Sequence, residues 1–562
     1  MRQRGKLIIA GMLGALFCLG LGGCAKIGHF ARRRADKAAT TIIREKQREA
    51  LGQAGAFSLD GAEDPTTREL LGRAARLDWG NDAFTTPTTT LKLAEALALA
   101  VANNRDYKTQ REALYSQALA LTETRRNFGP IFNASGSAQI THIDGSTADA
   151  VTAGAATESF GSRAFSAGVS QVLATGATIG LNFSHQFTRF LTGDPLPTSV
   201  NTLSLSAVQP LLNGVGPLVT LEPLRQDERS MIYAVRAFRR YQQGFIIEVA
   251  SGYYGLLASQ DQLHNALRNY QSALLNWRKL KRYAQGGKST EIEVGQARQK
   301  VLEAEAGLSD SQQGYSRQLD LFKLFLGLPV DLDIGPDHRE LEAVAARGLL
   351  RPDMTLRKAI DLALKDRLDL ATARQAVEDS GRKLSIAEQN FLPTLDAFYN
   401  YGTSDSGDKE RLHLDLDNRS RQYGLNLVLP LDWTLRRNAY VRAQLVQDQA
   451  RRAYDQARDS LILEVRDDWR QLEQLRTNYR IQQESVALAE RQVKSTSMLL
   501  QMGRATARDL LDAQDALLAS RNAATAALVS HTIERLRFWN AIERLEIDPK
   551  GMWYENAAPT KR

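Results

Sequence analysis

Two very long helical patterns, each followed by a glycine, dominate the chain. Residues 219–286 and 435–502 have the pattern of continuous helices, and the only proline within them is Pro223. As an α-helix, each stretch would be roughly 100 Å long, far longer than an ordinary globular helix. Gly287 and Gly503 follow, with Ser or Thr within the next three residues. Glycine can leave a helix in the left-handed conformation and Ser or Thr can cap the next helix. We therefore predict two helical hairpins with tips at Gly287 and Gly503.

The returning arm of each hairpin carries a seam of small and apolar residues. The seam positions recur at alternating steps of four and three, which predicts knobs-into-holes packing between closely approaching helices. They are Ala297, Val301, Ala304, Leu308, Ser311 and Tyr315 in the first arm, and Ala513, Leu517, Ser520, Ala524 and Ala527 in the second.

Alternating small or apolar and polar residues predict strands before each hairpin. They cover residues 131–140 and 203–209 in the first half, and 394–401 and 423–429 in the second. A tilted transmembrane strand needs about 9–11 residues, and long polar loops such as 403–420 are typical of membrane barrels, although a soluble hairpin looks similar. The first half also holds strand patterns at 164–173 and 177–187, separated by a Thr-Gly turn. This extra hairpin either joins the barrel or packs elsewhere.

The two halves form an internal repeat. Asn127 to Pro130 and Asn390 to Pro393 both read Asn-Phe-x-Pro, 263 positions apart, and end a helix before a strand. We therefore divide the chain into a signal peptide (1–23), a lipid-anchored tether (24–89), a first strand-helix repeat (90–327), an equatorial linker (328–354), a second repeat (355–547) and a C-terminal tail (548–562).

The N-terminus predicts secretion. A basic start precedes the apolar residues 7–23, as in a secretory signal. Leu21-Gly22-Gly23-Cys24 resembles a bacterial lipobox, which implies lipidation of Cys24; an ordinary cleaved signal with an incidental cysteine is the alternative. Residue 25 is alanine, not the aspartate that would suggest retention at the inner membrane. The predicted destination is the outer membrane, with the chain extending into the periplasm. The mature chain would keep only Cys24, which excludes an internal disulfide.

The positive charge is confined to the N-terminal region. The net charge is +8, and residues 1–50 account for all of it, so nucleic-acid binding is not indicated. The cluster Arg32-Arg33-Arg34 with Lys37 would either contact anionic lipid head groups or belong to a solvated tether. The seven histidines are scattered without metal-ligand spacing, and no catalytic motif is present. We expect no enzyme, no metal and no cofactor.

Over about residues 88–547, the order and lengths of these features resemble the TolC family of outer-membrane efflux proteins. The resemblance rests on the two repeats, the Asn-Phe-x-Pro motif and the run Asp509-Leu510-Leu511-Asp512-Ala513-Gln514. It implies an α+β membrane protein: a homotrimeric transmembrane β-barrel continued by a long antiparallel α-helical coiled-coil tunnel. An open sheet cannot stand in lipid, so neighbouring chains would close it. The implied function is a passive exit duct of a tripartite efflux or type I secretion system, with a periplasmic adaptor and an inner-membrane transporter as partners.

The resemblance also implies a periplasmic gate lined by aspartates, which would be Asp509 and Asp512 here. They are three residues apart and share one helix face, so three chains would form a ring of carboxylates that attracts cations. A solvated acidic face is the alternative. Where better-known members have a gate-locking tyrosine and arginine, this chain has Leu500 and Ala505.

Nearby charges could take over the locking and docking roles at the tips. Arg504 and Arg508 are candidates for the locking contacts. Glu291 and Glu293 at the first tip could bind an adaptor or be plain surface charge, and Gly287 and Gly503 could also dock it.

Two other functions compete with the duct. A periplasmic adaptor would have one long hairpin between half-lipoyl β segments, whereas this sequence has two hairpins. A structural coiled-coil lipoprotein spanning the periplasm would not need paired strands bounded by Pro130, Pro210, Pro393 and Pro430. The exported substrate is not indicated by the sequence.

Overall fold

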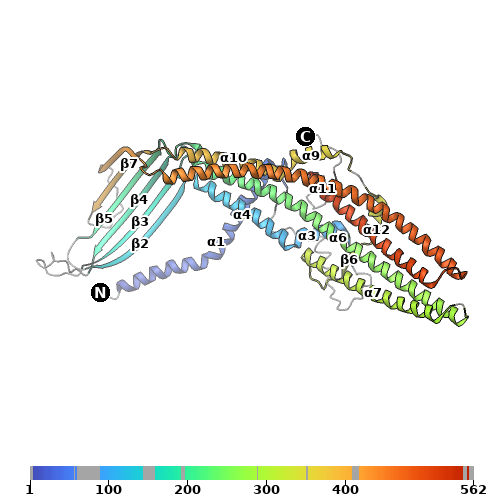
Figure 1. Ribbon diagram of the computed structural model, residues 1–562. Coiled ribbons are helices and arrows are strands. Elements are labelled where there is room, and N and C mark those ends of the chain that lie inside the picture. The colour runs from blue at the N-terminus through green and yellow to red at the C-terminus, as the bar shows by residue number, and fades with distance from the viewer. Residues whose placement is uncertain are drawn as a thin grey trace. The chain divides into compact units, whose positions relative to one another are not determined.

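The protein is described by a computed structural model (Figure 1). It describes residues 4–55, 57, 59, 89–143, 158–191, 196–287, 289–349, 352–407, 417–547 and 553–555. Its contacts form two compact units: unit 1 comprises Met1–Glu49, Tyr115–Ala234 and Arg374–Ala453, and unit 2 comprises Ala50–Leu114, Val235–Ala373 and Tyr454–Arg562. Each unit therefore draws on both predicted repeats.

Unit 1 contains a six-stranded antiparallel sheet in the order β2-β3-β4-β5-β7-β8 (Figure 1). The predicted extra hairpin forms β3 and β4 and lies between β2 and β5, so it joins the sheet. Every strand, β8 included, extends beyond the predicted end that faces the polar loops. The strands are β2 (Ile131–Ile143), β3 (Glu158–Val172), β4 (Thr178–Phe190), β5 (Thr198–Pro210), β7 (Thr394–Gly407) and β8 (Arg419–Val428). Residues 408–416 of the predicted long loop lie outside the described residues.

The helical periodicity and the breaks were predicted closely. The first long pattern forms the short α5 (Pro217–Thr220) and then α6 (Glu222–Gln285), where Pro223 is tolerated because the first helical turn needs no internal N–H bond. The second pattern forms α11 (Thr434–Gln501), and the returning arms are α7 (Glu291–Leu326) and α12 (Ala507–Ala541).

The 263-residue offset relates the shorter helices as well. α3 (Leu93–Asn103) and α4 (Arg105–Asn127) correspond to α9 (Leu356–Asp366) and α10 (Leu368–Gln389). Both pairs break at equivalent positions, Asn104 and Arg367, where the backbone is extended or otherwise non-helical.

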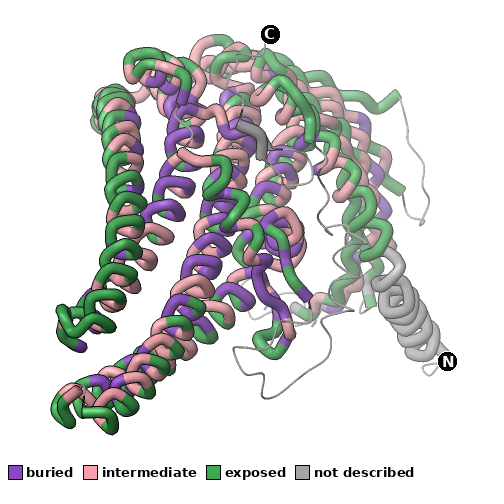
Figure 2. Tube along the Cα trace, turned by 90° about the vertical axis from the view of Figure 1, so that its right-hand side faces the viewer, coloured by how far each residue is buried: buried purple, intermediate pink, exposed green. Residues whose placement is uncertain are grey.

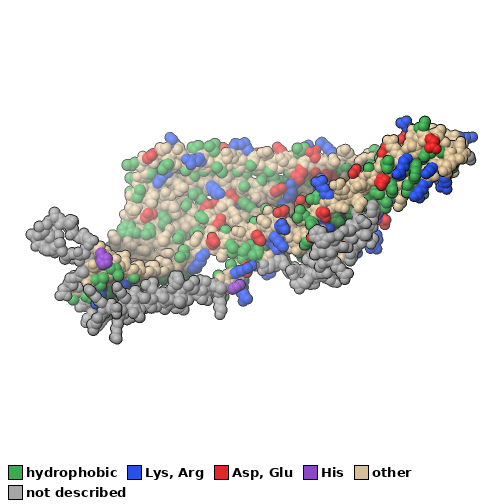
Figure 3. Space-filling view, turned by 90° about the horizontal axis from the view of Figure 1, so that it is seen from below, with side chains coloured by type: hydrophobic (Ala, Val, Ile, Leu, Met, Phe, Trp, Pro, Cys, Tyr) green, Lys and Arg blue, Asp and Glu red, His purple; other side chains and the backbone are tan. Residues whose placement is uncertain are grey.

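The core of unit 2 lies between α6, α7 and α12. Tyr253 and Leu257 of α6 and Phe538 of α12 are fully buried, and the hydroxyl of Tyr253 donates to the carbonyl oxygen of Leu91 at 2.8 Å. The seam residues Ala297 and Val301 are buried as predicted. Figure 2 shows exposed residues gathered at the ends of the helical hairpins. Figure 3 shows acidic and basic side chains mixed over the helices, with no face of a single sign in that view.

The predicted equatorial linker is partly ordered in unit 2. Its β6 (Ile334–Pro336) pairs in parallel with β1 (Thr89–Leu91), and α8 (Arg339–Arg347) follows. A carboxylate oxygen of Glu340 accepts from the backbone N–H of Leu93 at 3.3 Å, which joins α8 to the start of α3. Near the C-terminus, β9 (Leu545–Ile547) pairs with β10 (Trp553–Glu555), and the rest of the predicted tail lies outside the described residues.

The N-terminal region forms the helix α1 (Arg4–Leu51). Its second half packs in unit 1: Ile43 is buried, and the hydroxyl of Tyr115 donates to the Asp36 carboxylate at 2.6 Å. Residues 60–88 of the predicted tether lie outside the described residues. Within the described part of the chain, none of the helices combines the length and the apolar character that crossing a membrane requires.

Candidate functional site at the hairpin tips

Both hairpin tips are built on a left-handed glycine. Gly287 has φ 72° after α6, and Gly503 has φ 71° after α11. At the second tip, the backbone N–H of Arg504 donates to the carbonyl oxygen of Leu499 at 2.9 Å, the closing bond of a Schellman turn. A side chain at either glycine would be strained in this conformation.

Each tip then starts the returning helix with the same capping box. The hydroxyl oxygens of Thr290 and Thr506 accept from the backbone N–H groups of Glu293 and Asp509, both at 3.2 Å. In return, the carboxylates of Glu293 and Asp509 accept from the backbone N–H groups of the two threonines. The acidic residue therefore satisfies donors at the helix N-terminus that would otherwise lack partners.

Asp509 and Asp512 are both exposed, but only Asp509 takes part in the cap. The Asp509 carboxylate accepts from the backbone N–H of Thr506 at 2.8 Å and from its hydroxyl at 2.7 Å, and these hydrogen bonds lower the pKa of Asp509. One turn further, a carboxylate oxygen of Asp512 lies 4.0 Å from Arg508 of the same helix. Asp509 thus has a structural role that the gate interpretation had not included. The motif Thr-x-x-Asp would have indicated it in the sequence.

At the first tip, too, one acidic residue caps the returning helix and the other does not. Glu293 accepts hydrogen bonds from the hydroxyl of Ser289 and the backbone N–H of Thr290, and these lower the pKa of Glu293. Glu291 is exposed in the first turn of α7. Of the two predicted adaptor contacts, Glu291 has the carboxylate that the cap does not use.

An ion pair joins the two returning arms near the tips. The ammonium group of Lys300 on α7 lies 2.5 Å from a carboxylate oxygen of Asp515 on α12. Burial lowers the pKa of Lys300, but its hydrogen bonds to Asp515 and Glu303 outweigh burial and raise it overall. Nearer the tips than this pair, Leu280, Ala297 and Ala507 form a buried cluster of α6, α7 and α12. Sequence reasoning missed the pair, because no local pattern relates residues 300 and 515.

Polar bridges continue along the same hairpins. The amide of Asn265 on α6 donates to the side-chain oxygen of Asn522 on α12 at 2.9 Å, and the hydroxyl of Thr525 donates to the Asp261 carboxylate at 2.6 Å. Within one chain, the first hairpin is therefore held to the second by a series of specific polar contacts.

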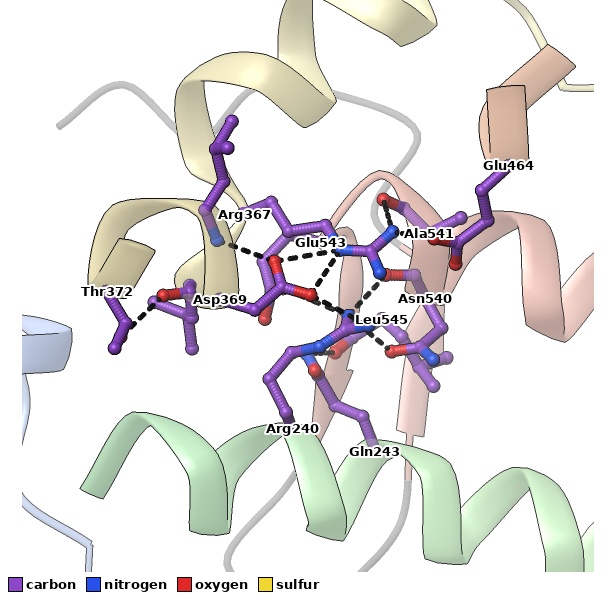
Figure 4. A network of polar contacts seen from close by, with 12 residues as sticks. Arg240, Gln243, Arg367, Asp369, Thr372, Glu464, Asn540, Ala541, Glu543 and Leu545 are labelled. Carbon is purple, nitrogen blue, oxygen red and sulfur yellow. Dashed lines mark hydrogen bonds and ion pairs between the residues drawn. The ribbon is translucent and has the colours of Figure 1, made fainter. Parts of the chain in front are cut away.

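A second polar network, in unit 2, joins four helices around Arg367 (Figure 4). Arg367 lies at the break between α9 and α10 and pairs with Glu464 of α11 at 2.8 Å and with Asp369 at 3.0 Å. Arg240 of α6 donates to the carbonyl oxygen of Asn540 at 3.0 Å and pairs with Glu543 at 3.3 Å. Because guanidinium groups satisfy several acceptors at once, this network fixes the end of α12 against α6 and α11.

Next to this network, α11 and α12 carry partly buried carboxylates. Burial, followed by repulsion from Glu534 and Glu464, raises the pKa of Asp468 to about 7. Burial also raises the pKa of Glu534.

Comparisons with known proteins agree with this architecture. Residues 359–539 match a family described as outer membrane efflux protein. The alkaline protease secretion protein AprF of Pseudomonas aeruginosa is 27% identical over 354 residues, which cover 61% of this chain and 69% of that protein. Among solved structures, the CmeC outer membrane channel of Campylobacter jejuni is 16% identical with a TM-score of 0.58, covering 80% of this chain and 85% of its own. The open state of the Neisseria gonorrhoeae MtrE outer membrane channel is 16% identical with a TM-score of 0.56. The match covers 80% of this chain and 88% of the MtrE chain.

The fold and these matches define an exit duct for efflux or secretion at the outer membrane. The match over residues 359–539 and the similarity to AprF confirm the resemblance to outer membrane efflux proteins seen in the sequence. Proteins of this class are transport ducts and not enzymes, so the expectation that the chain is no enzyme is also confirmed. At their low identities the solved structures establish the fold alone.

Proposed function

We propose that three copies of the chain form a passive duct of a type I secretion system. The strands would close a barrel in the outer membrane, and the helices would form a periplasmic tunnel that meets an adaptor and an inner-membrane transporter at the hairpin tips. The single observation that carries this proposal is the six-stranded sheet of unit 1, with one apolar face, one polar face and two edge strands.

The faces of the sheet differ in the way a barrel wall in lipid requires. The register aligns Phe132, Val169, Leu181, Leu205 and Tyr401 across five neighbouring strands on one face. In the single chain this face is widely open to solvent: Phe132 is 72% exposed, and Tyr423 and Leu425 of β8 are 80% and 67% exposed. An exposed apolar surface of this extent suits contact with lipid.

The edges of the sheet support an oligomer. Among the described residues, β2 pairs only with β3, and β8 pairs only with β7. Unpaired backbone groups cannot remain in hydrocarbon, so β8 of one chain would pair with β2 of the next until the ring closes. A cyclic trimer, as the family resemblance implies, satisfies this requirement.

The relative AprF, named for alkaline protease secretion, favours a secreted polypeptide over a small molecule as the cargo. Efflux of small molecules in a tripartite system is the second candidate, supported by the family match over residues 359–539. At the N-terminus, Cys24 would carry the lipid anchor, as the lipobox resemblance implies.

At the periplasmic end, the proposed gate is a ring of carboxylates from Asp512 of three chains. Asp509 lies about one turn earlier on the same helix. Asp512 is 72% exposed, and its contact with Arg508 is long at 4.0 Å, so its charge remains available to ions in the bore. Asp509 contributes charge as well, but its carboxylate is oriented by the cap.

The test is conductance of the purified protein in a planar lipid bilayer, together with heat-modifiable migration on a gel. We expect a heat-modifiable trimer and cation-preferring channels, with the preference reduced in Asp512→Asn. Asp467→Asn, at an exposed aspartate of α11 away from the tip, is the matched control and should retain the preference. Unchanged selectivity in Asp512→Asn would remove the gate assignment. A chain that forms neither trimers nor channels would overturn the duct.

A further inference from the structure

The two repeats contribute unequal numbers of strands to the sheet. The first repeat supplies β2, β3, β4 and β5, whereas the second supplies only β7 and β8. The difference is the β3–β4 hairpin, inserted between two strands that would otherwise be the counterparts of β7 and β8. Its connection is short: the backbone N–H of Gly176 donates to the carbonyl oxygen of Leu173 at 2.9 Å, and Gly176 has φ 92°.

The inserted hairpin is paired along its whole length. β3 pairs with β2 from Ile131↔Ser170 to Ile143↔Glu158, and β4 pairs with β5 from Thr178↔Val208 to Thr188↔Thr198. The hydroxyl groups of Ser135 and Ser166 lie 2.7 Å apart across the β2–β3 boundary. The hairpin is therefore part of the sheet and not an appendage packed on its surface.

The hairpin also continues both faces of the sheet. Phe165 and Val169 of β3 and Leu181 and Phe183 of β4 fall on the apolar face, which also carries Arg163 and Arg189 in the half of the hairpin nearer the long loops. The opposite face carries small and polar residues at alternating positions: Ser166, Gly168 and Ser170 of β3, and Gly180, Asn182, Ser184 and Gln186 of β4. A hairpin with one face for lipid and one for water has the pattern of a wall element of a membrane barrel.

We propose, on the basis of the trimeric duct proposed above, that this hairpin widens the barrel so that it passes polypeptides with secondary structure. Three copies of the six-stranded sheet close a barrel of about 18 strands, the size at which porins hold an aqueous channel. Without β3 and β4 the barrel would have about 12 strands.

The additional strands change which cargo fits. With strands about 4.8 Å apart and tilted by about 40°, the backbone diameter is about 36 Å for the wide barrel and about 24 Å for the narrow one. Side chains reduce the free width to about 25 Å and about 14 Å respectively. A single helix is about 10–12 Å across, so a helical pair fits only the wider barrel.

The polar face suits a hydrophilic cargo of either charge. On the described strands, the register places only two charged residues on this face, Glu158 at the start of β3 and Asp396 near the start of β7. The remaining positions are mostly Ser, Thr, Asn, Gln and Gly, with a few apolar residues. Such a lumen binds polypeptide weakly and does not select by charge, as a passive exit requires.

A pair of cysteines tests whether the hairpin stays in the wall of the assembled barrel. Ser135→Cys/Ser166→Cys should form a disulfide in heat-modifiable trimers isolated from outer membranes, because the two side chains face each other across β2 and β3. The matched control is Ser135→Cys/Ser204→Cys, whose second residue pairs with Asn182 of β4 and should not cross-link. Cross-linking of the control pair instead would mean that β2 pairs with β5 and would overturn the proposal.

Polymer exclusion tests the width. A polyethylene glycol of about 10 Å hydrodynamic radius, added on the extracellular side in a planar bilayer, should enter the wild-type barrel and lower its conductance. A variant lacking residues 158–190 should exclude it. Wild-type channels that exclude the polymer would overturn the wide barrel while leaving the duct intact, whereas the absence of trimers and channels in the wild type would count against the duct itself. If the deletion variant does not assemble, polymer entry into the wild-type channel and the two cysteine pairs still decide whether the barrel is wide.

Discussion

Lys300 and Asp515 join the two returning arms of one chain through an ion pair of 2.5 Å. Lys300 and Asp515 lie in the first few turns of α7 and α12, a few residues beyond the cluster of Leu280, Ala297 and Ala507, so the pair joins these helices close to both tips. Leu500 and Ala505 occupy the positions where the resemblance implied a locking tyrosine and arginine, and neither can form such a bond. Lys300 and Asp515 instead form an ion pair between the two returning arms near the tips.

Breaking this ion pair should loosen the tip of the second hairpin. We predict that Lys300→Ala and Asp515→Ala increase the open probability of the channel several-fold in a planar bilayer, because the contact restrains α12 against α7. The exchanged pair Lys300→Asp/Asp515→Lys should return it towards the wild-type value. Glu303 also pairs with Lys300, at 3.0 Å but within α7, so Glu303→Ala is the control and should have little effect. Equal effects of Glu303→Ala and Asp515→Ala on the open probability would contradict a restraining role of the Lys300–Asp515 ion pair.

The capping role of Asp509 can be separated from a role in ion selectivity. Asp509→Ala removes an acceptor for the backbone N–H of Thr506 and should destabilise the start of α12. Faster amide hydrogen exchange over residues 507–511 would report it. Asp512→Ala at the neighbouring exposed carboxylate should leave the exchange rates of these amides unchanged, and equal protection in both variants would refute the cap.

The tip glycines should not tolerate a side chain. Gly287→Ala and Gly503→Ala place a Cβ at φ near +72°, which should cost about 1 kcal/mol each and make the tips more sensitive to protease. Gly295 lies inside α7 with open space around it, so Gly295→Ala should instead stabilise slightly. Limited proteolysis of the three variants compares them directly, and a tip variant as resistant as Gly295→Ala would contradict the turn geometry.

Asp468 should make the protein less stable at alkaline pH. Burial raises the pKa of Asp468 from 3.8 to about 7, so the folded state favours the protonated form. The stability penalty therefore begins above pH 4, grows as the unfolded chain ionises, and is complete above about pH 7. We expect Asp468→Asn to raise stability by about 1 kcal/mol at pH 8, after discounting for solvent screening, and to change little at pH 4. Thermal unfolding at both pH values is the measurement, and a gain of equal size at pH 4 would exclude the carboxylate as the cause.

The elements were largely predictable from local patterns, and the site only in part. Proline and glycine punctuate the long helices, so the tips at Gly287 and Gly503 follow from chain order. The equivalent breaks at Asn104 and Arg367 have no proline or glycine beside them and were not predicted. The function of Asp509 depends on a hydrogen bond to a residue three positions away, a motif present in the sequence. The contact of Lys300 with Asp515 could not be predicted, because it depends on how two separate hairpins pack.

The sequence by itself determined two long hairpins, six strand patterns and their repetition in two halves, because helical and strand periods and turn residues act over a few neighbours. Only the tertiary structure decided that β3 and β4 lie between β2 and β5. An alternating pattern states that a strand has two different faces, but not which strand lies beside it. Pairing between distant strands is set by backbone hydrogen bonds and by matching faces, and these depend on the whole sheet.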